Sequence, residues 1–173
     1  MTPEFSRPVR VDGIPASGTV REIAAREAER RALAGRFGIV AIESLSARVA
    51  LRRTGEDDIA VTARFAARVV QECVVTLDPV AGDIDEEVAL LFRPVGPEAL
   101  DRKTVVIPAD EDFEPFAGES LDIGEAVAVE LALCLDPFPR SPDADAAAGH
   151  GDEALPERGD SPFRVLAGRT ENR

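Results

Sequence analysis

The residues that most often carry out chemistry in proteins are few in this sequence and poorly placed for it. The only histidine, His150, lies between two glycines in a stretch rich in Pro, Asp and Ala, where nothing would hold it as a general base. Neither a Gly-rich phosphate loop nor a G-x-S-x-G nucleophile turn is present. We therefore expect a binding protein rather than an enzyme, with no cofactor and no small-molecule substrate.

Carboxylates are the most numerous reactive groups, and they gather in polar runs. One run covers residues 83–87, and a second lies between residues 110 and 119. Catalysis by paired carboxylates needs one pKa raised inside a pocket, and we expect nothing in an exposed run to raise one. The second run is predicted to be an irregular, exposed loop. Its candidate partner-binding acids are Asp110, Glu111, Asp112 and Glu114. A solvated face without a partner is the alternative.

The two cysteines, Cys73 and Cys134, lie far apart in the sequence, each within an apolar stretch. A disulfide framework needs closely spaced pairs and an oxidising compartment, so we interpret both as buried, reduced thiols that hold no metal. The N-terminus lacks the basic and apolar regions of a signal peptide, and no apolar run reaches the length of a membrane span. We expect a cytoplasmic protein without membrane contact.

Two alternating segments give the clearest structural pattern. Residues 45–52 and 59–69 alternate between apolar and polar side chains, and a short Gly-containing loop separates them. This pattern predicts an antiparallel hairpin with one face in the core and the other facing outward. The outward side chains include four arginines, Arg48, Arg52, Arg64 and Arg68.

These arginines form a candidate face for binding the phosphates of a nucleic acid. If Leu51 pairs with Val61, then Arg48 lies opposite Arg64, and like charges across a strand pair are unfavourable unless an anion neutralises them. Phosphate would do so, because the guanidinium group binds it through two parallel hydrogen bonds. Acids from neighbouring elements are the alternative source of neutralisation.

The remaining segments predict two helices and several short strands. One helix is expected over residues 21–35, supported by the i,i+4 pairs Glu22–Arg26 and Glu27–Arg31 and ended by Gly35 and Gly38. A second, amphipathic helix is expected from Asp122, where Asp122 and Glu125 are spaced as a capping box. Short strands are expected over residues 5–12, 73–77, 84–92 and 104–107.

These elements predict one α+β domain over residues 1–139. A curved antiparallel sheet, which could be barrel-like, would pack with the two α-helices. Residues 140–173 are acidic and poor in large apolar side chains, so we expect a mostly disordered C-terminal tail. Its short apolar segment, residues 162–166, is either a docking segment or a random cluster.

The net charge of −13 is unevenly distributed. Residues 21–70 carry ten Arg against seven acids, whereas residues 71–173 sum to −16. The whole molecule therefore repels nucleic acid at long range, although one segment could meet it locally. The sequence has no Trp and no Tyr, which argues against an aromatic surface that stacks single-stranded bases.

Residues 72–80, ECVVTLDPV, resemble the signature of the YceD-like family of bacterial ribosome-production proteins. Many members read C-x-x-C-L-x-P; Cys73, Leu77 and Pro79 are similar to that pattern, while Thr76 stands at the second cysteine. Two thiolates at this spacing usually form half of a zinc site. Because Thr76 cannot supply the second thiolate, the resemblance carries over no metal role to this chain. Further resemblances lie in residues 5–9, in the helix entry at Asp122, Gly124 and Glu125, and at Pro162 and Phe163.

The resemblance implies a part in accumulation of the large-subunit ribosomal RNA, through non-catalytic binding. Two hypotheses remain open for the direct partner. The chain could contact ribosomal RNA through the arginine face. Alternatively, its acidic half could act as an adaptor or chaperone for a basic large-subunit ribosomal protein or assembly factor, with no direct RNA contact.

Overall fold

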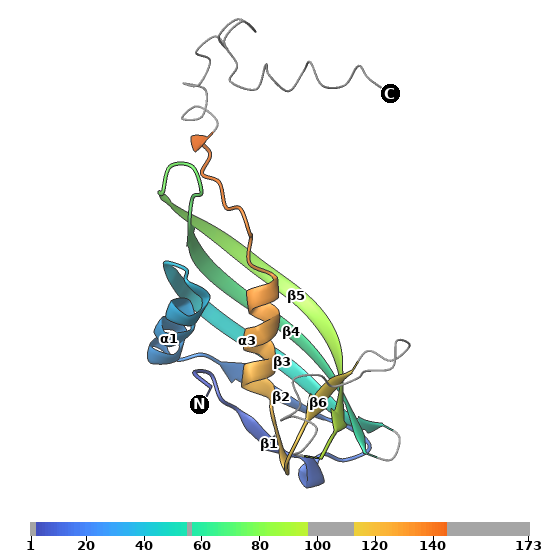
Figure 1. The fold of residues 1–173 in the computed structure, drawn as a ribbon. Coiled ribbons are helices and arrows are strands. Elements are labelled where there is room, and N and C mark those ends of the chain that lie inside the picture. Colours follow the sequence, from blue (N-terminus) through green and yellow to red (C-terminus); the bar gives the residue numbers. More distant parts are fainter. Residues whose placement is uncertain (1–2, 55–56, 97–112, 145–173) are drawn as a thin grey trace, which may run out of the picture.

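The computed structural model describes residues 3–54, 57–96 and 113–144, which form an α+β fold. The described elements, in chain order, are β1 (Pro8–Arg10), the 3-10 turn η1 (Val11–Gly13), β2 (Thr19–Ala24), α1 (Glu27–Phe37), β3 (Ala41–Thr54), β4 (Asp58–Glu72), β5 (Pro79–Pro94), β6 (Glu114–Phe116), β7 (Ser120–Asp122) and α3 (Ile123–Leu133). Figure 1 shows the long strands β3, β4 and β5 running side by side behind α3.

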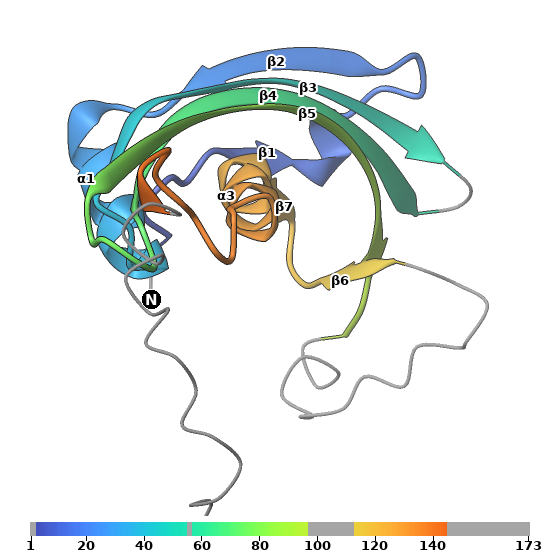
Figure 2. The ribbon, with the colours of Figure 1, turned by 90° about the horizontal axis from the view of Figure 1, so that it is seen from above.

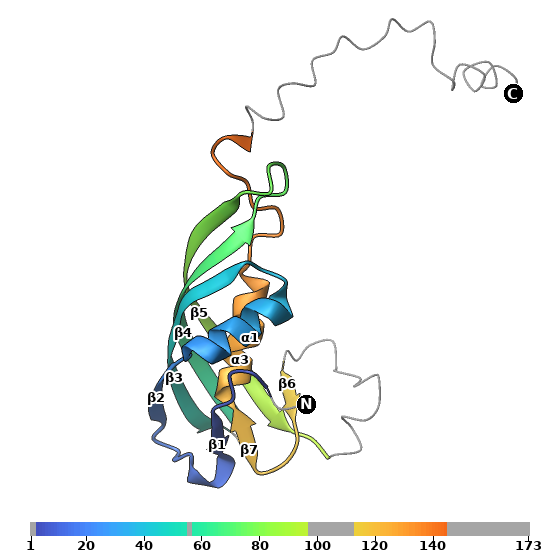
Figure 3. The ribbon, with the colours of Figure 1, turned by 90° about the vertical axis from the view of Figure 1, so that its left-hand side faces the viewer.

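The main sheet has the order β2-β3-β4-β5-β6, and a separate pair joins β1 to β7. All neighbours in the main sheet are antiparallel except β5 and β6, which are parallel. The sheet curves around α3 and stays open, so the predicted curvature is confirmed without closure into a barrel (Figure 2). Both helices and the β1–β7 pair lie inside the curve, and no described helix covers the outer face (Figures 2 and 3).

The predicted hairpin is confirmed in its register. Leu51 pairs with Val61, and Arg48 pairs with Arg64. Side chains at alternate positions of both strands are buried, among them Val49 and Phe65 at 0% and 1% exposure. Because successive side chains of a strand point to opposite faces, this alternation places the apolar set against α3 and the arginines on the outer face.

The helix predicted over residues 21–35 begins later than expected. Residues 19–24 form β2, which pairs with β3 from Thr19↔Leu51 to Ala24↔Ser46, so the predicted Glu22–Arg26 helical pair is wrong. Alanine, glutamate and arginine favour a helix locally, but pairing with a neighbouring strand outweighs that weak preference. Helix α1 contains Gly35 and ends at Gly38, which takes a left-handed conformation at φ 67°.

The apolar segment that follows β4 is a turn instead of the predicted strand. The Cys73 N–H donates to the Asp78 carbonyl at 2.8 Å, and the Leu77 N–H donates to Cys73 at 3.0 Å. Strand β4 continues to Glu72 and β5 starts at its partner Pro79, so the residues between them must reverse the chain. The predicted strand over residues 84–92 is confirmed within the longer β5.

The predicted acidic loop is only partly described. Residues 114–116 form β6, and Phe113 and Phe116 are each 8% exposed. The loop prediction is therefore wrong for these residues, because the two phenylalanines pack inward and hold the segment against β5. Residues 110–112 and the predicted strand over 104–107 lie outside the described residues.

The predicted end of the domain at residue 139 remains a prediction. The described chain continues from Pro139, which accepts a 2.9 Å hydrogen bond from the Val74 N–H, to Ala144, which is 1% exposed. The predicted disordered tail begins within this segment, but residues 145–173, with the apolar segment 162–166, lie outside the described residues.

Candidate binding surfaces

The outer-face arginines are engaged by carboxylates of the neighbouring strands. Arg64 donates to both carboxylate oxygens of Asp85 on β5, at 3.1 and 3.2 Å. Arg48 lies 3.5 Å from Glu22 on β2. The repulsion expected between Arg48 and Arg64 is therefore relieved within the sheet, by the alternative source of negative charge that the sequence left open.

Arg68 is held from two sides. It donates to Glu43 at 3.0 Å and to both oxygens of Asp83, at 3.0 and 2.9 Å. Arg52, further along β3, forms no ion pair with the described residues. The candidate RNA-binding arginines therefore share one face, as predicted, but three of the four already contact carboxylates.

A shallow depression lies between Arg48 and Arg64. Its volume is about 450 Å³, and small residues, among them Ala24, Ser46 and Ala66, line it. Glu22 and Asp85 also line it, so its charges balance. Exposed ion pairs are worth about 0–1 kcal/mol each, so a phosphate could compete for the arginines at a modest cost.

A second depression, here called the β5–α3 groove, lies on the concave side of the sheet. Its volume is about 200 Å³, and apolar and acidic side chains line it without a basic one among the described residues: Leu90, Phe92, Glu114, Asp122, Glu125, Ala126, Val129 and Glu130. Glu114 is the one predicted partner-binding acid that the structure describes. Asp110, Glu111 and Asp112 lie outside the described residues.

One carboxyl group of the groove has the raised pKa that the sequence did not predict. Burial raises the pKa of Glu130, and the nearby charge of Glu114 raises it further. Burial also raises the pKa of the Cys134 thiol, with contributions from the charges of Glu86 and Glu130. These shifts identify a region of excess negative charge beside apolar side chains, which favours a cation that brings apolar groups with it. This acidic and apolar region forms only when the chain folds, because its residues come from three separate elements of the sequence, β5, β6 and α3.

Cys73 is fully buried, as predicted, whereas Cys134 is only partly buried, so the prediction of two buried thiols is wrong for Cys134. The Cys73 sulfur accepts three backbone hydrogen bonds. The donors are the N–H groups of Val75 and Thr76 at 3.4 Å and of Ser141 at 3.3 Å. A hydrogen bond from the Thr76 hydroxyl is the main cause that lowers the Cys73 pKa to about 6, against the opposing effect of burial. One sulfur beside the Thr76 hydroxyl group does not fit a thiolate metal centre. Among the described residues no group of three candidate ligands occurs.

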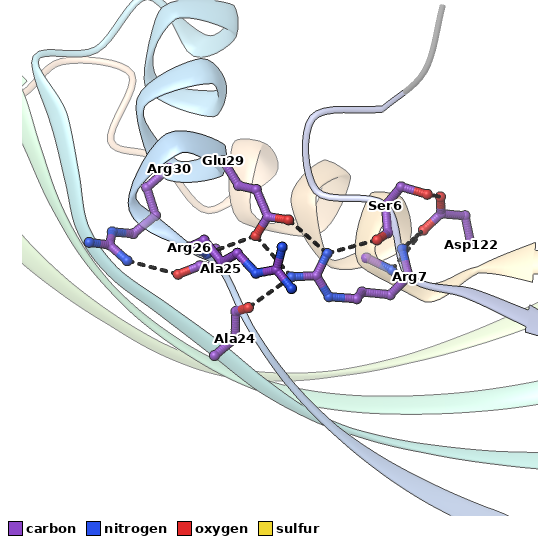
Figure 4. A network of polar contacts seen from close by, with 9 residues as sticks. Ser6, Arg7, Ala24, Ala25, Arg26, Glu29, Arg30 and Asp122 are labelled. Carbon is purple, nitrogen blue, oxygen red and sulfur yellow. Dashed lines mark hydrogen bonds and ion pairs between the residues drawn. The ribbon is translucent and has the colours of Figure 1, made fainter.

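Several residues of the family resemblance meet at one junction between the N-terminal segment and α3 (Figure 4). Asp122 caps α3 by accepting hydrogen bonds from the N–H groups of Gly124 and Glu125, both at 3.1 Å. It also accepts from the Arg7 N–H at 2.7 Å and from the Ser6 hydroxyl. The predicted cap is confirmed, except that Glu125 pairs with Arg36 at 2.7 Å instead of completing the box.

At the same junction, position 124 requires glycine, and Arg7 links the N-terminal segment to α1. A Cβ atom on Gly124 would lie 2.0 Å from the Phe5 carbonyl oxygen, so no larger residue fits without displacement of the backbone. Arg7 donates to both carboxylate oxygens of Glu29 at 2.9 and 2.8 Å (Figure 4). We conclude that these residues hold the fold together. Of the other signature residues, Leu77 is 66% exposed, Pro79 starts β5, and Pro162 and Phe163 are not described.

No helix among the described residues is long and apolar enough to cross a membrane. Comparisons with curated proteins and with solved structures give no significant match. Residues 61–168 match the model of one family, described as large ribosomal RNA subunit accumulation protein YceD. The match includes the segments around Cys73, Asp122 and Pro162, whereas residues 5–9 precede it. This chain therefore belongs to the YceD family.

Proposed function

We propose that this chain is a non-catalytic binding factor in biogenesis of the large ribosomal subunit, and that it acts by holding a basic protein partner. The family match supports the process. The distribution of unpaired charge supports the kind of partner: Glu86, Glu114 and Glu130 form no ion pair with described residues. Such a surface speeds encounters with basic proteins and repels the phosphate backbone.

Ribosomal proteins and their assembly factors are the basic partners that this process offers. Holding one until delivery would support accumulation of the large-subunit RNA without direct contact with that RNA. The work would be done in the cytoplasm and would need no cofactor.

Direct RNA contact remains a second candidate, and one observation favours it. Arg48 and Arg64 face each other across the outer-face depression, where a phosphate could replace their exposed carboxylate partners. A double substitution, Arg48→Glu with Arg64→Glu, would abolish RNA contact by this route and leave capture of a basic protein intact.

Depletion of the chain from cells tests the process directly. We expect large-subunit ribosomal RNA to fall relative to small-subunit RNA, and the tagged chain to sediment with precursors of the large subunit. Equal loss of both RNAs, or sedimentation apart from those precursors, would contradict the proposal.

A further inference from the structure

We infer that the open edge of β5 is a docking site for an extended, basic segment of a partner protein, which joins the main sheet as a further strand. This inference rests on the proposed function, because it names the surface and the backbone conformation through which a basic protein would be held.

Most of the outer edge of β5 has no neighbour in the described chain. The strand has 16 residues and pairs with β4 continuously from Glu72↔Pro79 to Ile59↔Phe92. On its other side, among the strands that the structure describes, only Phe92, Arg93 and Pro94 pair, with β6. The N–H and C=O groups of alternate residues before Phe92 therefore point to an edge without a described strand, and such an edge is a template for strand addition.

The side chains of this edge select the charge of the added strand. Asp83, Asp85 and Glu87 lie on the outer face of β5, and Glu86 lies on the inner face opposite Phe65. Acids along an edge keep a second copy of the same strand away by repulsion. The same negative charges attract a strand that carries basic side chains. Glu86, opposite Phe65, forms no ion pair with a described base, so its charge is available, whereas Glu87 lies opposite Arg64 and shares that arginine with Asp85.

Protection against self-pairing would explain the acids alone, but it does not explain the apolar surface beside them. Val129 and Leu133 of α3 are 42% and 74% exposed, and Val129 lines the β5–α3 groove together with Leu90. Near the end of α3, the charge of Glu86 on β5 acts on Cys134. Near the start of α3, Phe92 of β5 and Asp122 line the same groove. Helix α3 thus follows β5 over much of its length.

A strand added beside β5 would continue the curve of the sheet around α3 (Figure 2). Its inward side chains would reach the groove and the exposed flank of α3, and its outward side chains would lie beside Asp83, Asp85 and Glu87. The occupant is therefore an extended segment in which apolar residues alternate with Lys or Arg, with period two.

Hydrogen exchange on the full-length chain, followed by nuclear magnetic resonance, tests the inference. The probe is a peptide of about ten residues that alternates Val and Lys, a length at the upper end of common strands. In the free chain, the β5 amides that alternate with those bonded to β4 should exchange fast. They should become protected when the peptide is added. A Val-Glu peptide and an N-methylated Val-Lys peptide should give no protection.

Two matched variants separate this edge from general attraction between opposite charges. Glu86→Lys with Glu87→Lys should weaken peptide binding by about tenfold or more, because both acids border the added strand. Glu22→Lys with Glu27→Lys changes the net charge equally at exposed sites on β2 and α1. It should change binding by less than about twofold.

Three results would overturn the inference. The edge amides could already be protected in the free chain, either in a monomer, where another part of the chain covers the edge, or in a dimer detected by light scattering. Peptide-induced protection could appear away from β5. Both double variants could weaken binding equally. Because none of these measurements uses cells, such a failure is distinguishable from failure of the proposed function, which sedimentation with large-subunit precursors tests.

Discussion

Glu29 and Glu130 are both partly buried glutamates on helices, yet their surroundings shift their acidity in opposite directions. Hydrogen bonds from Arg7 lower the Glu29 pKa from 4.5 to about 2, whereas burial and the charge of Glu114 raise the Glu130 pKa. The N-terminal junction around Glu29, which includes Asp122 and Glu125, is therefore electrostatically satisfied, whereas the part of the β5–α3 groove around Glu114 and Glu130 is not. A satisfied region stabilises a fold, while an unsatisfied region gains from a cationic partner. We expect substitutions in the first region to affect stability and those in the second to affect binding.

The largest effect is expected at the closest contact of the junction. Gly124→Ala should destabilise the chain by about 3 kcal/mol or more, because the backbone must move away from the added methyl group. The matched control is Gly35→Ala in α1, where an added Cβ meets nothing within 4 Å; it should stabilise by about 0.5–1 kcal/mol. Chemical denaturation measures both changes. Equal effects of the two substitutions would mean that Gly124 is not constrained by Phe5.

Removal of the α3 cap should have the next largest effect. Asp122→Ala should cost about 2 kcal/mol, because it leaves the first N–H groups of α3 and the Arg7 N–H without their acceptor. All three N–H groups bond to the same oxygen, Oδ1. Asp122→Asn preserves that acceptor and should retain most of the stability in thermal or chemical unfolding. A loss as large as that of Asp122→Ala would contradict the capping role.

The Arg7–Glu29 pair should make stability depend on pH in the acid range. Since the folded pKa of Glu29 lies below its ordinary 4.5, its contribution is present above that value and is lost as the pH falls towards 2. Glu29→Gln should cost about 1–3 kcal/mol at neutral pH and should flatten the acid loss of stability. Glu27→Gln, which replaces an exposed acid two residues nearer the start of α1, should leave the acid dependence unchanged.

The smallest effect on stability is expected in the groove. Because the folded pKa of Glu130 is raised, its ionised form opposes folding, and that cost appears as the pH rises through the folded pKa. Glu130→Gln should therefore leave stability at neutral pH unchanged or raise it by a few tenths of a kcal/mol, about the size of a surface substitution. A clear loss of stability would show that Glu130 stabilises the fold as Glu29 does, and would contradict the difference proposed between the two glutamates.

The sequence predicted well what depends on local pattern. The alternation in β3 and β4 predicted the strand pairing down to the Arg48–Arg64 contact, and the spacing of Asp122 and Glu125 predicted the start of α3. Where pairing with distant strands competes with local preference, prediction failed. Residues 21–24 have helical composition but form β2, and the apolar residues after Cys73 reverse the chain.

The candidate sites were harder to predict than the elements. The outer-face arginines were found, but their neutralisation depends on the register between β4 and β5, which places Arg68 opposite Asp83. The raised pKa of Glu130 depends on burial between elements that are far apart in sequence. No period or motif in one segment contains that information.

Affinity purification of the tagged chain from cells, with bound protein and RNA both identified, tests the central claim most directly. The wild-type chain should retain a basic protein of large-subunit assembly. A Glu114→Gln, Glu130→Gln variant should lose it, while Arg48→Glu with Arg64→Glu should keep it. Retention of ribosomal RNA alone, lost only when the two arginines are reversed, would contradict the account and favour direct RNA contact.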